Sequence, residues 1–259
     1  MQTFATEIYN YKSLIFALTK RHLAQRYRGS LLGFLWSFIN PLCLMLVYAL
    51  VFKYYIRFSA VDHYAIFLFT GLLPWLWFVS SLTEGVGSIV ASGHLVTKAM
   101  FPAHVLPLVA VLTNLVNFIL SLPLLFVFMA FYGVDFYPTL FALPALIALQ
   151  AVFTYGLGLA LASLNVYYRD VQHILGNVLN FLFFLCPILY PVDVVPERLR
   201  FTLDFNPLAV FTTGYHKIIL DGALPSLLSW AFLLFSSLCA LVLGIAIYNK
   251  NHETFAELL

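Results

Sequence analysis

The sequence predicts an all-α integral membrane protein with six transmembrane helices. Of its 259 residues, 63% are apolar and only 9% are charged, and the mean hydropathy is +0.95. Soluble domains are about half apolar and about one quarter charged. The charged residues also fall between apolar segments, several of which reach the roughly 20 residues that a helix needs to cross a bilayer. We therefore expect residues 1–259 to form one transmembrane domain.

The first predicted span covers residues 31–52, a run of 22 residues without a formal charge. A helix of that length extends about 33 Å at about 1.5 Å per residue, which is enough to cross a hydrocarbon core of about 30 Å. The cations that precede it are Lys12, Lys20, Arg21, Arg26 and Arg28. Positively charged flanks stay on the cytoplasmic side, so we expect a cytoplasmic N-terminus.

Residues 1–30 are predicted to form a cytoplasmic interface helix. Apolar side chains recur at helical spacing at Ile8, Tyr11, Ile15 and Leu18, with lysines and arginines between them. A helix with one apolar and one basic face can lie on the cytoplasmic leaflet. A solvated helix that leads into the first span is the alternative.

Five further spans are expected at 64–90, 105–132, 139–164, 174–190 and 226–248. Residues 191–225 differ from these segments because they contain four prolines and seven charged side chains. The most apolar part of that region, 208–220, has 13 residues and is too short to cross, so we expect an outer helical hairpin with a re-entrant or interfacial helix. Residues 249–259 are then a cytoplasmic tail, and both termini lie inside.

The sequence contains no pattern typical of catalysis. It has no G-x-x-x-x-G-K-[ST] phosphate loop, no H-E-x-x-H, no cysteine and histidine cluster at metal-ligand spacing, and no pair of carboxylates within a span. We expect a transport subunit with no metal or cofactor of its own, rather than an enzyme. The formal charge of +2 and the lack of basic runs argue against a nucleic-acid partner.

Glu84 is the one carboxylate inside a predicted span. Placing such a group in a membrane costs at least about 2.5–3.5 kcal/mol, so an intramembrane carboxylate is a functional candidate. The alternative is that Glu84, about two turns from the inner end of its span, is simply reached by water.

Aromatic residues are in excess, with 26 Phe, 4 Trp and 15 Tyr. Aromatic faces give broad apolar contact without a fixed demand for hydrogen bonds, which suits a path for a large amphipathic solute. The candidates in the first and fifth spans are Phe34, Trp36, Phe38, Tyr48, Phe181, Phe183, Phe184 and Tyr190. Interfacial or lipid-facing positions are the alternative for each of them.

Six motifs occur in an order and spacing that resemble one known family. They are RYRGSLLGFLWSFINP at 26–41, GLLPWLWF at 71–78, LVTKAMFP at 95–102, LNVYYRDVQHI at 164–174, CPILYP at 186–191 and NPL at 206–208. On these motifs the whole chain resembles the membrane subunits of type-2 ABC polysaccharide exporters, especially those for lipid-linked O-antigen. Capsule and teichoic acid exporters share several motifs and stay open as alternatives.

The resemblance implies export of an undecaprenyl-diphosphate-linked polysaccharide across a bacterial inner membrane. It also implies a homodimer that binds two separate ATPase subunits, which carry the ATP and Mg²⁺. Two cytoplasmic loops would contact the ATPases, through Lys98, Phe101 and Pro102 in one and Tyr168, Arg169 and Asp170 in the other. An inner anchor with a local ion pair is the alternative for Arg169 and Asp170.

We expect Arg26 and Arg28, just before the first span, to attract the lipid diphosphate at the cytoplasmic leaflet. Two other classes stay open. A secondary transporter should show an internal repeat and several intramembrane ionisable groups, and neither is found. An integral membrane glycan-modifying enzyme would need a constellation of carboxylates or histidines in an outer loop, and only the Pro-rich 191–225 region offers carboxylates there.

Overall fold

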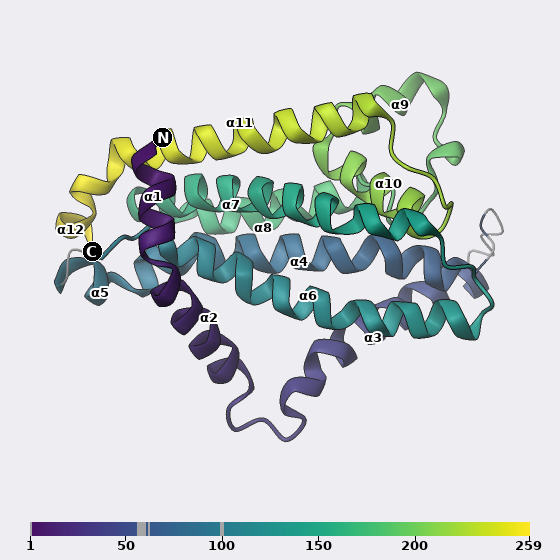
Figure 1. Ribbon diagram of the computed structural model, residues 1–259, viewed down its shortest axis with the longest axis horizontal. Coiled ribbons are helices and arrows are strands. Elements are labelled where there is room, and N and C mark those ends of the chain that lie inside the picture. The colour runs from purple at the N-terminus through teal and green to yellow at the C-terminus, as the bar shows by residue number, and fades with distance from the viewer. Residues whose placement is uncertain (1, 56–60, 62, 99–100) are drawn as a thin grey trace.

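The computed structural model describes residues 2–55, 61, 63–98 and 101–259, and the described residues form helices and connecting segments without a strand (Figure 1). Four long helices run along the long axis of the molecule. They are α4 (Tyr64–Ala91), α6 (Val105–Phe131), α7 (Leu143–Tyr167) and α11 (Leu227–Asn251). Within the described ranges, these four are the helices that are long and apolar enough to cross a membrane.

The first and fifth predicted spans form shorter helices than the sequence suggests. Residues 31–35 are not part of the α-helix, because Gly29 and Gly33 have φ of 79° and 49° and turn the chain. The helical segments are η1 (Gly33–Leu35), α3 (Trp36–Ala49) and the π-helical η2 (Leu50–Tyr55). The fifth predicted span corresponds to α8 (Asp170–Phe184), which starts before residue 174 and ends before residue 190. It ends there because Pro187 disfavours helical geometry at the residue before it.

The N-terminal arm consists of α1 (Gln2–Asn10) and α2 (Lys12–Tyr27). Ile15 is buried against Val105 and Val109 of α6, with Ile8 and Leu18 beside it. This contact places the arm on the first turns of α6. An amphipathic helix that lies on the leaflet stays a prediction. Beyond this contact α2 leads away from the bundle and α3 returns to it, so the two helices form a V (Figure 1).

The predicted outer hairpin contains two helices, α9 (Glu197–Asp204) and α10 (Pro207–Ile219), after the short η4 (Val192–Val194). Phe211 and Tyr215 of α10 are buried in the bundle, and His216 Nε2 lies 3.0 Å from the Phe67 carbonyl oxygen of α4. The hairpin is thus packed into the helices it follows. Its re-entrant position in a membrane stays a prediction.

The remaining short helices are α5 (Gly93–Lys98), η3 (Pro138–Ala142), η5 (His252–Thr254) and α12 (Phe255–Leu258).

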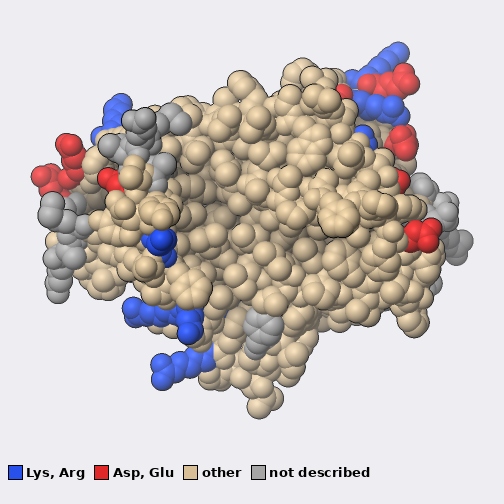
Figure 2. All heavy atoms as spheres, viewed as in Figure 1, with Lys and Arg blue, Asp and Glu red and all other residues tan. Residues whose placement is uncertain are grey.

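The two ends of the molecule carry the charges. Both termini, α5 and α12 lie at one end and α9 at the other (Figure 1). On the visible face, Lys, Arg, Asp and Glu gather at these ends and along α2, with a broad uncharged band between (Figure 2). That distribution fits a membrane around the middle of the bundle.

Candidate functional site

Two residues that the sequence singled out separately, Arg26 and Glu84, form an ion pair. Arg26 Nη2 donates to Glu84 Oε1 at 2.5 Å and to Oε2 at 2.6 Å. Asn114 completes the cluster, because its Oδ1 accepts from Arg26 Nη1 at 2.9 Å and its Nδ2 donates to Glu84 Oε2 at 2.9 Å. One charge pair and one amide therefore connect α2, α4 and α6.

Each helix contributes its residue from the inner part of the bundle. Arg26 lies in the last turn of α2, and Asn114 Nδ2 also donates to the Ala110 carbonyl oxygen at 3.0 Å, which fixes the amide on α6. The Arg26 and Glu84 side chains are 30% and 41% exposed, so neither is fully enclosed by this chain. Whether water reaches Glu84 stays a prediction. Asn114 was missed from sequence, although two amides in an otherwise apolar helix, Asn114 and Asn117, were a usable signal.

Arg28 lies apart from this cluster. It caps the C-terminal end of α2 in an extended conformation and is exposed. Among the residues that the structure describes, Arg26 and Glu84 form the one ion pair, so Arg28 has none. The two predicted diphosphate ligands therefore differ, since Arg26 contacts the bundle and Arg28 does not.

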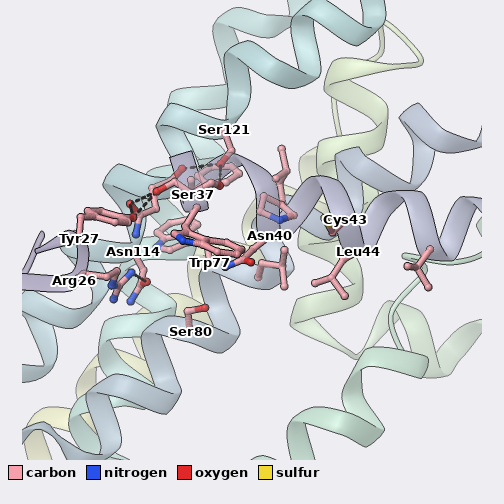
Figure 3. Close-up of a pocket in the computed structure, with 17 residues that line it drawn as sticks. Arg26, Tyr27, Ser37, Asn40, Cys43, Leu44, Trp77, Ser80, Asn114 and Ser121 are labelled. Carbon is pink, nitrogen blue, oxygen red and sulfur yellow. Dashed lines mark hydrogen bonds between the residues drawn. The ribbon is translucent and has the colours of Figure 1, made fainter. Parts of the chain in front are cut away.

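A cavity of about 640 Å³ lies between α3, α4 and α6, and we call it the membrane-side cavity (Figure 3). Arg26, Tyr27 and Asn114 line one end, and Leu44 lies at the other with Cys43. The cavity is therefore polar near the ion pair and apolar farther along α3.

Hydrogen bonds close the polar end of this cavity. Tyr27 Oη donates to Asn117 Oδ1 at 2.9 Å and also contacts the Ser37 hydroxyl. Ser121 Oγ donates to the Ser37 carbonyl oxygen at 3.3 Å. These bonds hold the ends of α2 and α3 against α6.

A second cavity of about 990 Å³ opens on the other side of Arg26, and we call it the inner cavity. Its lining comes from α2, α4, α6, α7 and the start of α8, and includes His22, Glu84 and Arg169. Burial lowers the pKa of His22 below its usual value; Glu84 opposes this effect, and Arg26 and Arg21 add to it.

The predicted aromatic path is only partly assembled in one chain. Tyr48 of α3 meets Phe183 of α8 with ring centroids 5.7 Å apart. Phe181 and Phe184 are exposed on α8, and Tyr190 Oη donates to the Phe184 carbonyl oxygen at 2.8 Å. Trp36 lines the membrane-side cavity, Phe38 is partly buried, and the Phe34 side chain lies outside the described set. Their role as a path stays a prediction.

The predicted ATPase-contacting loops lie at the same end of the bundle. Tyr168 and Arg169, between α7 and α8, and Asp170, the first residue of α8, are exposed. Phe101 and Pro102 precede α6, and the side chain of Lys98 is not among those described. In the described part of the chain Arg169 and Asp170 form no ion pair, and no group of histidine, cysteine or carboxylate side chains could hold a metal.

Comparison with known proteins identifies the family. The family model for the ABC-2 type transporter matches residues 13–220. The chain is 40% identical over 255 residues to the O-antigen export system permease protein RfbA of Myxococcus xanthus, covering 97% of each chain. It is 33% identical to RfbA of Klebsiella pneumoniae over 249 residues, 95% of each. The polysialic acid transport protein KpsM of Escherichia coli is 26% identical over 93% of this chain and 95% of its own. The chain belongs to the ABC-2 type transporter family.

Proposed function

We propose that this chain is the membrane subunit of an ATP-driven exporter that moves a lipid-linked polysaccharide of the O-antigen type across a bacterial inner membrane. The observation that carries the proposal is the 40% identity, over 97% of both chains, to an O-antigen export permease. The described structure is consistent with it, since cavities with polar and cationic walls lie at one end of an apolar bundle. Export of capsule polysaccharide is the second candidate. KpsM and the capsule polysaccharide export inner-membrane protein CtrC of Neisseria meningitidis match at 24–26% identity over at least 92% of the chain.

ATP hydrolysis belongs to a partner in this proposal. The sequence has no phosphate loop, so ATP and Mg²⁺ would bind to an ABC-type ATPase, two copies of which serve a homodimer of this chain. The ATPases would push on the 98–102 and 168–170 segments. Of their described residues, Phe101 and Pro102 lie at the same end of the bundle as 168–170. Each subunit would then cross six times, with α3 and α8 as its two shorter spans and both termini cytoplasmic.

The lipid diphosphate would be attracted to the inner leaflet by the charges of Arg26 and Arg28, and Arg26 would then bind it. Arg28 is exposed and without an ion pair in the described structure, whereas Arg26 is engaged by Glu84. Phosphate oxygens and the Glu84 carboxylate compete for the same guanidinium group, which donates to both Glu84 oxygens through Nη2 and can bind a phosphate in a bidentate fork. Cargo loading is therefore an exchange of anions on Arg26. The glycan would then follow the exposed aromatic side chains of α3 and α8 at the dimer interface.

Reconstitution with the partner tests this function. The purified chain should show no ATPase activity, and activity should appear when the ATPase encoded beside it is added. A strain lacking this permease should lose surface O-antigen and regain it on complementation. Persistent hydrolysis by the rigorously purified chain, or normal O-antigen in the deletion strain, would contradict the proposal. Loss of capsule with intact O-antigen would favour the second candidate.

A further inference from the structure

Two helices present the same set of side chains to the inner cavity. On α2 the order is histidine, glutamine, arginine, and around the start of α8 it is arginine, glutamine, histidine. The six residues are His22, Gln25, Arg26, Arg169, Gln172 and His173, and all of them line the cavity. We propose that these two faces form one binding site for a lipid diphosphate, with Arg169 as its second arginine in place of Arg28. The proposal deepens the proposed function and rests on it.

The spacing explains why each set shares one face. Both sets are separated by three and then one residue, and side chains at i, i+3 and i+4 lie together on a helix. Helix α4 lies between them and supplies Glu84, Gly87 and Ser88 to the wall. At Gly87 an added Cβ would lie 3.9 Å from Gln172 Oε1, so the α8 face reaches α4 across the cavity.

The charges suit a dense anion. Glu84 is the only carboxylate among the lining residues, and Arg26 neutralises it. Arg169 is exposed and forms no ion pair within the described ranges, so the cavity retains one uncompensated arginine. A diphosphate presents two phosphoryl groups, and a guanidinium fork can bind each of them. Arg28 lines neither cavity, and it therefore cannot supply the second fork in this arrangement.

The two cavities also offer separate binding regions for the lipid chain and for the first sugar of the glycan. Arg26 lines both cavities, and the membrane-side cavity becomes apolar toward Leu44 and Val47. A diphosphate at Arg26 thus has an apolar groove on the side of the membrane. In the inner cavity Asn165 is 3% exposed, and its Oδ1 has no hydrogen-bond partner in the described structure. This buried acceptor is placed to receive a hydroxyl of the sugar that follows the diphosphate.

One consequence concerns coupling. Arg169 lies between α7 and α8, in the segment proposed to contact the ATPase. A diphosphate bound to Arg169 therefore occupies the same turn on which the ATPase would act. Arg169 would then both bind the cargo and lie in the segment that the ATPase moves.

Lipid binding by the purified full-length chain tests the site without ATPase or glycan. Native mass spectrometry in detergent would compare undecaprenyl diphosphate, undecaprenyl monophosphate and phosphatidylglycerol. We expect the diphosphate to bind at least about tenfold more tightly than either other lipid, since only it engages both arginines. Inorganic pyrophosphate should compete with it.

Matched variants then assign the arginines. Arg169→Gln should weaken binding of undecaprenyl diphosphate at least about tenfold, and Arg169→Lys by less, because Lys keeps the charge but loses the fork. Arg28→Gln, outside both cavities, should change binding less than about threefold. Thermal unfolding in the same detergent separates misfolding from lost binding. Gln172→Ala is a second variant on the α8 face, and we expect it to weaken binding of undecaprenyl diphosphate severalfold.

Several results would overturn the assignment. They are unchanged affinity in Arg169→Gln, an equal loss in Arg28→Gln, or phosphatidylglycerol binding as tightly as the diphosphate, which would indicate a general anionic-lipid site. The proposed function is tested separately by export. If the diphosphate binds through Arg169 while cells make O-antigen without this chain, the site stands and the proposed function fails. If export needs the chain but Arg169→Gln binds normally, only the site fails.

Discussion

The pair of α7 and α11 and helix α2 of the N-terminal arm are held to the bundle by different forces. At the α7–α11 crossing an added Cβ on Gly156 would lie 2.4 Å from the Ala240 backbone carbon, and one on Gly244 would lie 2.3 Å from the Gly156 oxygen. Beyond the Ile15 contact, α2 instead relies on the Arg26–Glu84 pair and on the hydrogen bond from Tyr27 to Asn117.

The α7–α11 contact is therefore expected to stay fixed, whereas the polar contacts of the arm can change partners. Backbones in direct contact at glycines have one close-packed arrangement, and small residues at such crossings are what let membrane helices approach. Ion pairs and hydrogen bonds of partly exposed side chains can change partners at small net cost, because a ligand or water replaces each bond. Substitutions at α7–α11 should therefore affect folding, and substitutions in the arm should affect transport.

The largest effect is expected at the glycine crossing. Gly156→Leu should prevent accumulation of folded protein, because the clash is with the backbone of α11 and exceeds the about 1–3 kcal/mol typical of overpacking. The measurement is the membrane level and thermal unfolding of the purified chain. Gly176→Ala on α8 is the matched control, since its added Cβ meets nothing within 4 Å. Normal folding of Gly156→Leu would mean that α7 and α11 are not fixed in this way.

Arg26→Gln should give the next largest effect, on transport and not on folding. Both partners of the ion pair are partly exposed, so its loss should cost less than about 1 kcal/mol of stability. Surface O-antigen should nevertheless fall at least about tenfold, because the guanidinium shared by the two cavities is gone. Membrane level and O-antigen are measured in the same cells. Arg28→Gln serves as the comparison, and an equal loss in both variants would show that position at the leaflet matters more than the cavity.

Glu84→Gln should have a smaller effect on export than Arg26→Gln. It should also raise, rather than lower, the affinity for the lipid diphosphate. The amide keeps the size of the carboxylate and one acceptor oxygen but removes the anion that competes for Arg26. Affinity for undecaprenyl diphosphate should rise about threefold, while export falls because the cargo is released less readily. Wild-type binding and wild-type export together would leave Glu84 with a purely structural role.

Tyr27→Phe should have the smallest effect of the four. It removes the hydroxyl that reaches Asn117 and Ser37, a loss of about 0.5–1.5 kcal/mol. The end of α2 should then become more accessible, which cysteine labelling at neighbouring positions can measure. Tyr9→Phe is the control, because that exposed ring keeps its contact with Lys12 after the change. Equal labelling in the two variants would show that this hydroxyl does not hold the arm.

The sequence by itself determined the class and the four long apolar helices. Length and composition of a run decide whether it is helical and apolar, and a local count of cations predicts which end faces the cytoplasm. The six motifs also indicated the family that the comparisons confirm. Arg26 and Glu84 could both be selected in this way, because each is a charge beside or inside an apolar run.

Only the tertiary structure decided which residues meet. Arg26 and Glu84 are 58 positions apart, and nothing in either segment indicates that they pair through Asn114. The physical reason is that helices apolar on nearly every face carry little periodic signal for their rotation, so sequence pattern does not fix which face points to which neighbour. Rotation and crossing are set by packing, as at Gly156 on Ala240. The same packing places Arg169 and Arg26 on one cavity and leaves Arg28 outside it.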